Sequence, residues 1–388
     1  MPIVLAALFL FAILTLWIPA YWPVAVFQVG MFALCVVVLW RRPPTRIPYP
    51  AIPLAAAVVW GLVQLGASWT VYAFDTRMAV VQWATFLAVF ATGFCLFQEP
   101  ENLRWFRSAM IWFACGVSVW AVIQAFTADG KVFWLFPTSY TRNLMGPILY
   151  RNHYAAFIEA ALPIALYQAF RGGQGCLLYS AMAAAMYASV IASTSRTGTV
   201  LATAEILTVA LLMAVRGITT RRAVGAALLR AVILLAAFTA IVGWTRLWDR
   251  LREPDPMAMR NDFAMSSLRM IADRPFLGFG LGTWATIYPR YALVDSGTFT
   301  TRAHDDWLQF AVEGGVPFGI MIFTLFIWCL RPACRSVWGI GVIAVFLHAF
   351  VDYPFSRPAL GSWAILIIAM LAAADSASEA GETGFDSD

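Results

Sequence analysis

Apolar residues dominate the pattern of the chain. They form blocks of roughly 15–24 residues separated by short polar clusters, and about 20 apolar residues are needed for a helix to cross a bilayer. The alternating segments of membrane β-strands are absent. Only helices then satisfy their own backbone groups in lipid. We therefore predict an all-α, polytopic integral membrane protein.

The blocks predict about twelve transmembrane helices, with ten to fourteen possible because several blocks are short and Pro163 and Pro317 interrupt two of them. The predicted spans are 3–20, 22–40, 51–68, 78–97, 108–127, 153–170, 176–192, 199–215, 231–245, 307–330, 337–350 and 359–374.

The distribution of arginine predicts the orientation. With a cytoplasmic N-terminus, twelve arginines fall in inside loops, against six basic residues in the outside loops other than the longest. The positive-inside rule then places both termini in the cytoplasm. Residues 1–374 are expected to form one transmembrane domain, and the acidic segment 375–388 a disordered cytoplasmic tail. The longest loop, 246–306, is then extracytoplasmic and folded, with an amphipathic helix near 261–272.

Composition agrees with this class. Hydrophobic residues make up 61% of the chain and charged residues 12%, whereas a soluble domain carries about 25% charge. The net charge of +5 comes from arginines in loops between spans, so it does not indicate nucleic-acid binding. The six cysteines lie in or beside spans without a CxxC pair, which predicts neither a disulfide framework nor a cysteine metal site.

Four stretches carry polar residues at positions where insertion into a membrane disfavours them. Such positions are candidates for a functional site. They are 150–155, 193–198, the run from Arg269 through the glycine-rich 278–283 to Asp306, and 348–358.

The third stretch contains the main catalytic candidate. If the tenth helix begins near 302, then Arg302, Asp306, Gln309 and Glu313 share one stripe, which must face a cavity or other helices. A structural Arg302–Asp306 pair is the alternative. His304 projects from another face and is flanked by basic and acidic residues. Histidine accepts protons near neutral pH, so His304 is a candidate general base, and a structural role is its alternative.

Two arginines indicate the substrate. Guanidinium groups bind phosphate oxygens in bidentate fashion. Arg196 has no acidic neighbour in its own loop, whereas Arg269 precedes Asp273 by four residues and could form a helical salt bridge. A pyrophosphate-bearing ligand fits two such residues. A metal site is not predicted, since neighbours in sequence such as His304 and Asp305 rarely complete an octahedral set.

These residues resemble the O-antigen ligase family, which also contains repeat-unit polysaccharide polymerases. The matching motifs come in the family's order over roughly 140–360. They are Arg151-Asn152-His153-Tyr154-Ala155, Ser195-Arg196-Thr197-Gly198, Arg269 with Pro275-Phe276-Leu277-Gly278-Phe279-Gly280-Leu281-Gly282, Ala303-His304-Asp305-Asp306-Trp307-Leu308-Gln309 with Glu313-Gly314-Gly315, and His348 with Asp352. Asp305 stands where the family commonly has Asn, which would add a second base or restrain His304.

The resemblance implies a glycan donor carried on polyprenyl pyrophosphate and a hydroxyl acceptor on a glycan or lipid, with no metal and no cofactor. By this analogy, His304 would be the general base, and Arg196 and Arg269 would hold the pyrophosphate. The supporting residues would be Arg302, Asp305, Asp306, Asn152 and His348. The protein would lie in the bacterial inner membrane with its active site facing the periplasm. The carrier would enter sideways from the membrane lipid.

Three alternatives remain open at this point. A polymerase needs the same donor site as a ligase and differs only in its acceptor. A transporter of small anions or sugars would also place acids such as Glu159, Glu205 and Glu313 within the membrane, although the chain lacks the internal repeats common in transporters. A non-catalytic membrane scaffold is the third. For Trp284 and Tyr288, the alternatives are stacking on sugars and anchoring at the membrane interface.

Overall fold

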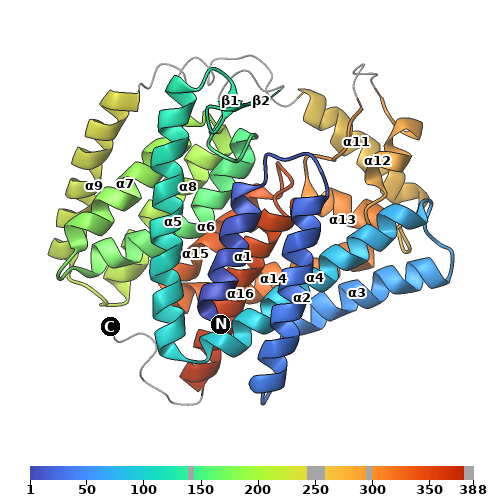
Figure 1. The fold of residues 1–388 in the computed structure, drawn as a ribbon, viewed down its shortest axis with the longest axis horizontal. Coiled ribbons are helices and arrows are strands. Elements are labelled where there is room, and N and C mark those ends of the chain that lie inside the picture. Colours follow the sequence, from blue (N-terminus) through green and yellow to red (C-terminus); the bar gives the residue numbers. More distant parts are fainter. Residues whose placement is uncertain (139–143, 243–257, 294–298, 380–388) are drawn as a thin grey trace.

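The computed structural model describes residues 1–138, 144–242, 258–293 and 299–379, and it is a bundle of helices (Figure 1). The first half of the described chain contains α1 (Pro2–Leu14), α2 (Trp22–Arg41), α3 (Ala51–Gly66), α4 (Ala73–Phe97), α5 (Pro100–Thr127), β1 (Lys131–Val132), β2 (Phe136–Pro137), α6 (Arg151–Arg171) and α7 (Cys176–Ala192). The second half contains α8 (Arg196–Val215), α9 (Arg221–Val242), α11 (Ala258–Asp273), α12 (Trp284–Ile287), η1 (Tyr288–Arg290), α13 (Asp306–Gly314), α14 (Val316–Arg335), η2 (Val337–Gly339), α15 (Ile340–His348) and α16 (Pro358–Glu379).

The structure supports an all-α polytopic membrane protein. Six of the described helices are long and apolar enough to cross a membrane, namely α2, α4, α5, α8, α14 and α16. Shorter apolar helices include α1, α3 and α7. A helix lies at each predicted span, but twelve crossings and the side to which the termini face stay predictions. Much of the predicted loop 246–306 is described as structure, including α11, whereas 246–257 and 294–298 lie outside the described residues.

Two expected element bounds require correction, and one short element was not predicted. The predicted span 307–330 is two helices, because the chain breaks at Gly315, whose φ is +83°. A Cβ there would lie 2.2 Å from the Phe276 carbonyl oxygen, so the bend needs glycine. The chain also forms one short antiparallel ladder, β1–β2. Finally, residues 375–379 of the predicted disordered tail continue α16, while 380–388 lie outside the described residues.

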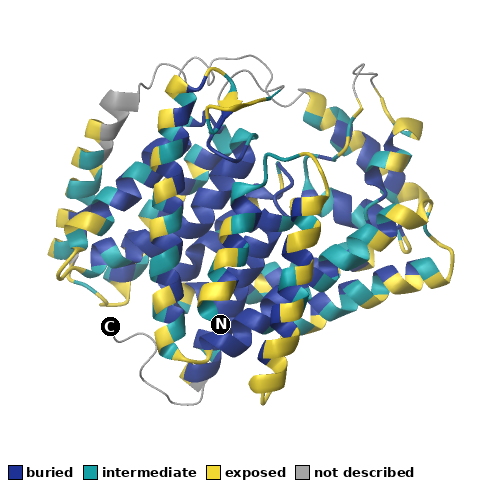
Figure 2. Cartoon of the chain, in the orientation of Figure 1, coloured by how far each residue is buried: buried dark blue, intermediate teal, exposed yellow. Residues whose placement is uncertain are grey.

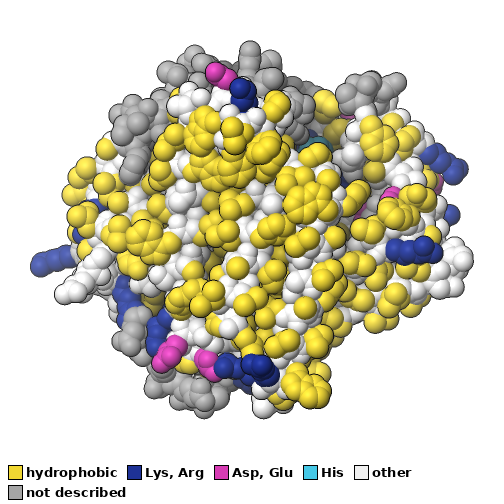
Figure 3. All heavy atoms as spheres, in the orientation of Figure 1, with side chains coloured by type: hydrophobic (Ala, Val, Ile, Leu, Met, Phe, Trp, Pro, Cys, Tyr) yellow, Lys and Arg dark blue, Asp and Glu magenta, His cyan; other side chains and the backbone are white. Residues whose placement is uncertain are grey.

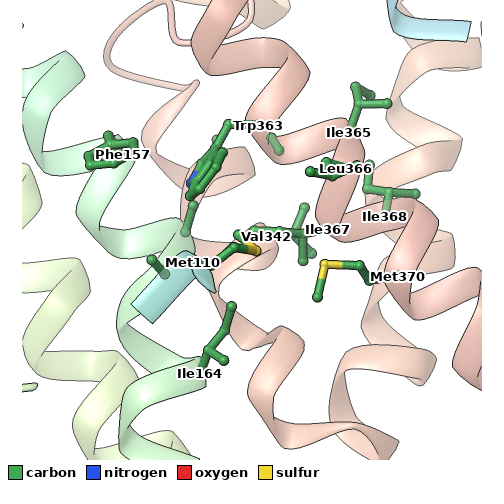
Figure 4. Packing of buried hydrophobic residues seen from close by; sticks show 14 of the residues in the cluster. Met110, Phe157, Ile164, Val342, Trp363, Ile365, Leu366, Ile367, Ile368 and Met370 are labelled. Carbon is green, nitrogen blue, oxygen red and sulfur yellow. The ribbon is translucent and has the colours of Figure 1, made fainter. Parts of the chain in front are cut away.

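The centre of the bundle is formed by α6 and α16, which Figure 2 shows as mostly buried. Phe157 of α6 packs against Trp363 of α16 with ring centroids 5.3 Å apart, and Figure 4 shows these rings beside aliphatic side chains of α15 and α16. Polar residues on α6 therefore have no access to lipid and must find partners inside the protein.

The outer surface is mostly hydrophobic. Figure 3 shows apolar side chains over the middle of one face, with Lys, Arg, Asp and Glu gathered toward its edges. Exposed large apolar residues such as Val36, Leu62, Trp112 and Leu211 occur on several helices. A soluble monomer rarely exposes so continuous an apolar surface, so this distribution indicates a lipid-facing belt.

Candidate active site

The buried carboxylate of Asp352 joins the polar stretches that the sequence singled out. Asn152 donates a side-chain hydrogen bond to Asp352 and accepts one of 2.9 Å from Ser195. Ser195 in turn caps α8 by accepting from the Gly198 backbone N–H at 3.2 Å. The backbone N–H of Asp306 donates to the Asp352 carbonyl at 3.1 Å. The N-termini of α6, α8 and α13 therefore meet at one turn, 349–357.

His304 lies at this junction. Its backbone φ is +56°, an uncommon value for a side-chain-bearing residue. The ring stacks on Phe263, meets Tyr353 edge-on at 4.8 Å, and places Nδ1 at 3.9 Å from Asp352 Oδ1. Burial lowers the pKa of His304, with Asp352 acting in the opposite direction and Arg260 reinforcing the decrease. The imidazole is therefore neutral at pH 7 and able to accept a proton.

His153 approaches the same carboxylate from α6. Its Nε2 lies 3.7 Å from Asp352 Oδ1 and has no hydrogen-bond partner among the described residues. The ring is 3% exposed and packs edge-on against Tyr150 and Tyr353. The sequence indicated this stretch but singled out Asn152 in it as a supporting residue and left out His153. Asp352 thus lies between two imidazoles.

Three arginines from three helices gather beside Asp352. Arg260 of α11 places Nη2 at 3.8 Å from Asp352 Oδ2 and hydrogen-bonds Tyr150. Arg151 begins α6 and Arg196 begins α8. The charges of Arg196 and Arg260 act on Arg151. We call Arg151, Arg196 and Arg260 the arginine cluster. The charges of all three arginines therefore act within one region, and Asp352 acts on Arg151 in the opposite direction.

Arg269 does not join this cluster. It is exposed, whereas Phe263, Ser267 and Met270 of the same helix are buried. Arg260 and Arg269 are nine residues apart, which at 3.6 residues per turn places them on opposite faces of α11, roughly 180° apart. The sequence motif containing Arg269 therefore lies on the helix that approaches Asp352, and Arg260 is the residue of that helix beside the carboxylate.

Asp305 is a helix cap. Its side chain accepts from the Leu308 backbone N–H at 2.9 Å at the start of α13. Burial raises the pKa of Asp305 to about 6, against the lowering effect of its backbone hydrogen bonds. Asn caps helices as well as Asp does, so the departure from the family's usual Asn preserves the local structure. Neither expected role of Asp305, a second base or a restraint on His304, included this capping contact.

Replacement of Asp305 by Asn is accordingly expected to leave glycan transfer within about twofold, because the cap is kept. Asp305→Ala is expected to lower the free energy of unfolding by about 1 kcal/mol, measured as a lower midpoint of thermal unfolding in nanodiscs. A collapse of transfer in Asp305→Asn at unchanged stability would instead show that the carboxylate takes part in catalysis.

Three of the four residues predicted to form a polar stripe on the tenth span do share one helix face. Asp306, Gln309 and Glu313 share the buried face of α13, and Gln309 donates to Glu313 at 2.9 Å. The helix begins at Asp306, so Arg302 lies outside it. Asp306 accepts instead from the Phe355 backbone and the Ser356 hydroxyl. Arg302 lines a cavity of about 730 Å³, as do His153 and Arg357.

His348 lies deeper than the junction. Its Nδ1 is 2.9 Å from a carboxylate oxygen of Glu159, and both side chains are fully buried. Glu205 on α8 is also buried, and neither carboxylate oxygen has a hydrogen-bond partner among the described residues. In the sequence motif His348-x-x-x-Asp352, α15 ends at His348 and Asp352 follows in a turn. His348 has a direct contact with Glu159 instead.

The glycine-rich turn is structural. The backbone N–H of Gly282 donates to Glu313 at 2.8 Å, and that of Gly280 donates to the Glu313 carbonyl at 2.9 Å. Trp284 is fully buried and stacks on Tyr288 at 4.5 Å. Neither proposed use of these aromatic residues fits, because neither ring is free to stack on a sugar or to reach the membrane interface. They pack beneath α11 and hold it over the site.

The described residues contain no group of three or more His, Cys, Asp or Glu side chains placed to hold a metal ion. The arginines at the junction carry fixed positive charge, which favours an anionic ligand.

The fold and this site define a multi-pass membrane protein with a cationic, histidine-containing centre where several helices begin. Residues 181–324 match the family model described as O-antigen ligase. This match confirms the resemblance to the O-antigen ligase family and supports a ligase- or polymerase-type function in the bacterial envelope. The matched segment contains Arg196, Arg260, Arg269 and His304, whereas Asn152 and Asp352 lie outside it. No curated protein matches the chain.

Proposed function

We propose that this protein transfers a glycan from a polyprenyl-pyrophosphate carrier to a hydroxyl acceptor, without a metal, at the outer face of the bacterial cytoplasmic membrane. The observation that carries the proposal is the position of His304. A neutral imidazole lies beside Asp352, and Asp352 lies beside the arginine cluster. A base and an anion-binding group are therefore adjacent.

The arginine cluster would hold the pyrophosphate. Arg260 and its two partners supply forked donors that match phosphate oxygens. The N-termini of α6 and α8 begin at Arg151 and Arg196, and backbone N–H groups at a helix start favour anions through the helix dipole. We propose this cluster in place of the pair Arg196 and Arg269 indicated by sequence, because Arg269 faces away from Asp352.

The chemical step needs only proton removal and charge stabilisation. The acceptor oxygen forms a bond to the anomeric carbon of the donor as the carbon–oxygen bond to pyrophosphate breaks. The pyrophosphate leaves with the electron pair, where the arginine cluster stabilises it. His304 takes the acceptor proton, and Asp352 stabilises the imidazolium that forms. These bond changes and the proton transfer balance without a change of oxidation state and without a metal ion.

Reconstituted transfer tests the proposal. The protein in lipid nanodiscs, given a polyprenyl-pyrophosphate oligosaccharide and hydroxyl acceptors, is expected to release polyprenyl pyrophosphate and a lengthened glycan in excess chelator, as read by mass spectrometry. A strict need for added divalent metal would contradict metal-free transfer. Absence of turnover together with saturable solute uptake into liposomes would favour the transporter alternative, for which the buried Glu205 is the supporting observation.

A further inference from the structure

A pocket lies at the ends of α6 and α8 that are opposite the junction. Its volume is about 220 Å³, and its lining residues are Tyr167, Arg216, Ile218, Arg335 and Val337. They come from the last turns of α6 and α14, the residues that follow α8, and the start of η2. Because η2 also contacts α6, α8 and α14, several elements meet at this pocket. We call it the α8-end pocket.

Arg216 supplies a fixed positive charge to the α8-end pocket. Its Nη1 donates to the backbone carbonyls of Cys334 and Arg335, which end α14. These neutral carbonyls are its only hydrogen-bond partners among the described residues, and it forms no ion pair with them. The contacts fix one side of the guanidinium, so its remaining donors are available to a ligand.

The second arginine of the α8-end pocket is already paired. Arg335 Nη1 lies 3.0 Å from Asp375 Oδ1 of α16. Asp375 does not line the pocket, and no acidic side chain does so among the described residues. The pocket therefore combines one guanidinium that an acid neutralises with one that contacts only neutral groups. This charge arrangement suits a ligand group with a single negative charge.

The helices beside the α8-end pocket face lipid up to their ends. α8 exposes Leu211 and Val215 in its last turns, and α14 exposes Ile327 and Leu330. Exposed apolar side chains of this kind contact acyl chains in a membrane, and the charged residues that follow them lie at the level of the headgroups. Basic pockets between membrane helices at this level bind anionic lipid headgroups. A soluble anion would make no use of the neighbouring apolar surface.

We propose that the α8-end pocket binds the phosphate of an anionic phospholipid, with Arg216 as the main donor and Arg335 beside it. The phosphate would join the ends of α8 and α14, so the bound lipid should stabilise the folded protein. In the predicted orientation this lipid belongs to the cytoplasmic leaflet. The site is separate from the proposed glycan transfer, because the arginine cluster lies at the opposite ends of α6 and α8.

Lipid retention tests the site without depending on turnover. The full-length wild type, Arg216→Gln and Arg335→Gln are titrated in detergent with phosphatidylglycerol and, separately, with phosphatidylethanolamine of the same acyl chains, and retention is read by native mass spectrometry. The wild type is expected to retain phosphatidylglycerol preferentially. Arg216→Gln should retain it about tenfold more weakly, because a charge-assisted hydrogen bond is lost. Arg335→Gln should lose about threefold, since Asp375 already pairs with that arginine.

The matched control is Arg41→Gln, which removes the same charge at the exposed end of α2 outside the pocket. It is expected to retain phosphatidylglycerol as the wild type does. Phosphatidylglycerol should also raise the thermal midpoint of the wild type and of Arg41→Gln, and raise that of Arg216→Gln less. Since Arg216 also contacts the end of α14, Arg335→Gln provides the test if Arg216→Gln fails to fold.

Three results would overturn the assignment. The first is equal retention of phosphatidylglycerol by the wild type and by the folded pocket variants. The second is an equal loss in Arg41→Gln, which would show attraction by net charge without a site. The third is displacement of phosphatidylglycerol by inorganic phosphate, with chloride at the same ionic strength as the reference, which would assign the pocket to a soluble anion.

Discussion

Replacement of His304 by alanine is expected to lower glycan transfer by about 10²–10⁴-fold, the usual contribution of a general base. The reason is its position, with Nδ1 at 3.9 Å from Asp352 and a ring held between Phe263 and Tyr353. The measurement is the rate of product formation in nanodiscs. Protein yield and thermal midpoint should stay near wild type because the ring is partly exposed.

The pH dependence separates a catalytic from a structural role. Because the pKa of His304 lies below its ordinary value of 6.5, the fraction of neutral base rises with pH through that lowered pKa and is complete at pH 7. Wild-type transfer should therefore fall only below pH 6.5, and the residual rate of His304→Ala should lose this acidic limb. If the variant keeps most of the rate and the same limb, His304 is not the base, and His153 becomes the candidate.

Substitution of Arg260 by lysine is expected to lower transfer by about 10–100-fold, because a point charge cannot reproduce two forked hydrogen bonds to phosphate, each worth about 1.5–3 kcal/mol. Arg196→Lys should show a loss of similar size. The matched control is Arg269→Lys on the same helix as Arg260, where the exposed side chain faces away from Asp352. It should stay within about twofold of wild type.

The reverse ranking would contradict the assignment. A large loss in Arg269→Lys with little loss in Arg260→Lys would place the pyrophosphate on the outer face of α11. If both Arg260→Lys and Arg196→Lys keep full activity, positive charge without bidentate hydrogen bonds is sufficient to bind the donor pyrophosphate. Measuring donor KM alongside turnover identifies the step, since loss of a contact made in both the ground and transition states raises KM alone.

The helices were predictable from the sequence because hydrophobic blocks report membrane burial directly. A helix lies at each predicted span, and the amphipathic helix near 261–272 is α11. The sequence indicated an interruption of the span 307–330 at Pro317, but not that the helix ends at Gly315. Apolar residues continue on both sides of it, and the bend depends on contact with Phe276, far away in sequence. Hydropathy carries no information on such a contact.

The site was predictable in part. The sequence singled out the motifs containing Asn152, Ser195 and Asp306, and the structure brings them together at Asp352, a meeting point that the sequence did not indicate. The choice between Arg260 and Arg269 required the orientation of α11, which depends on the buried face formed by Phe263 and Met270. Trp284 and Tyr288 were misjudged for the same reason, because the packing of aromatic residues in a loop depends on which helix covers them.

A structure of the protein with bound ligands tests the central claim most directly. The protein in nanodiscs would be imaged by cryo-electron microscopy with a non-transferable polyprenyl-pyrophosphate glycan. We expect its phosphates within hydrogen-bond distance of at least two residues of the arginine cluster and its anomeric carbon near His304. Phosphates on Arg302 and Arg357, or on Arg269, would contradict the account.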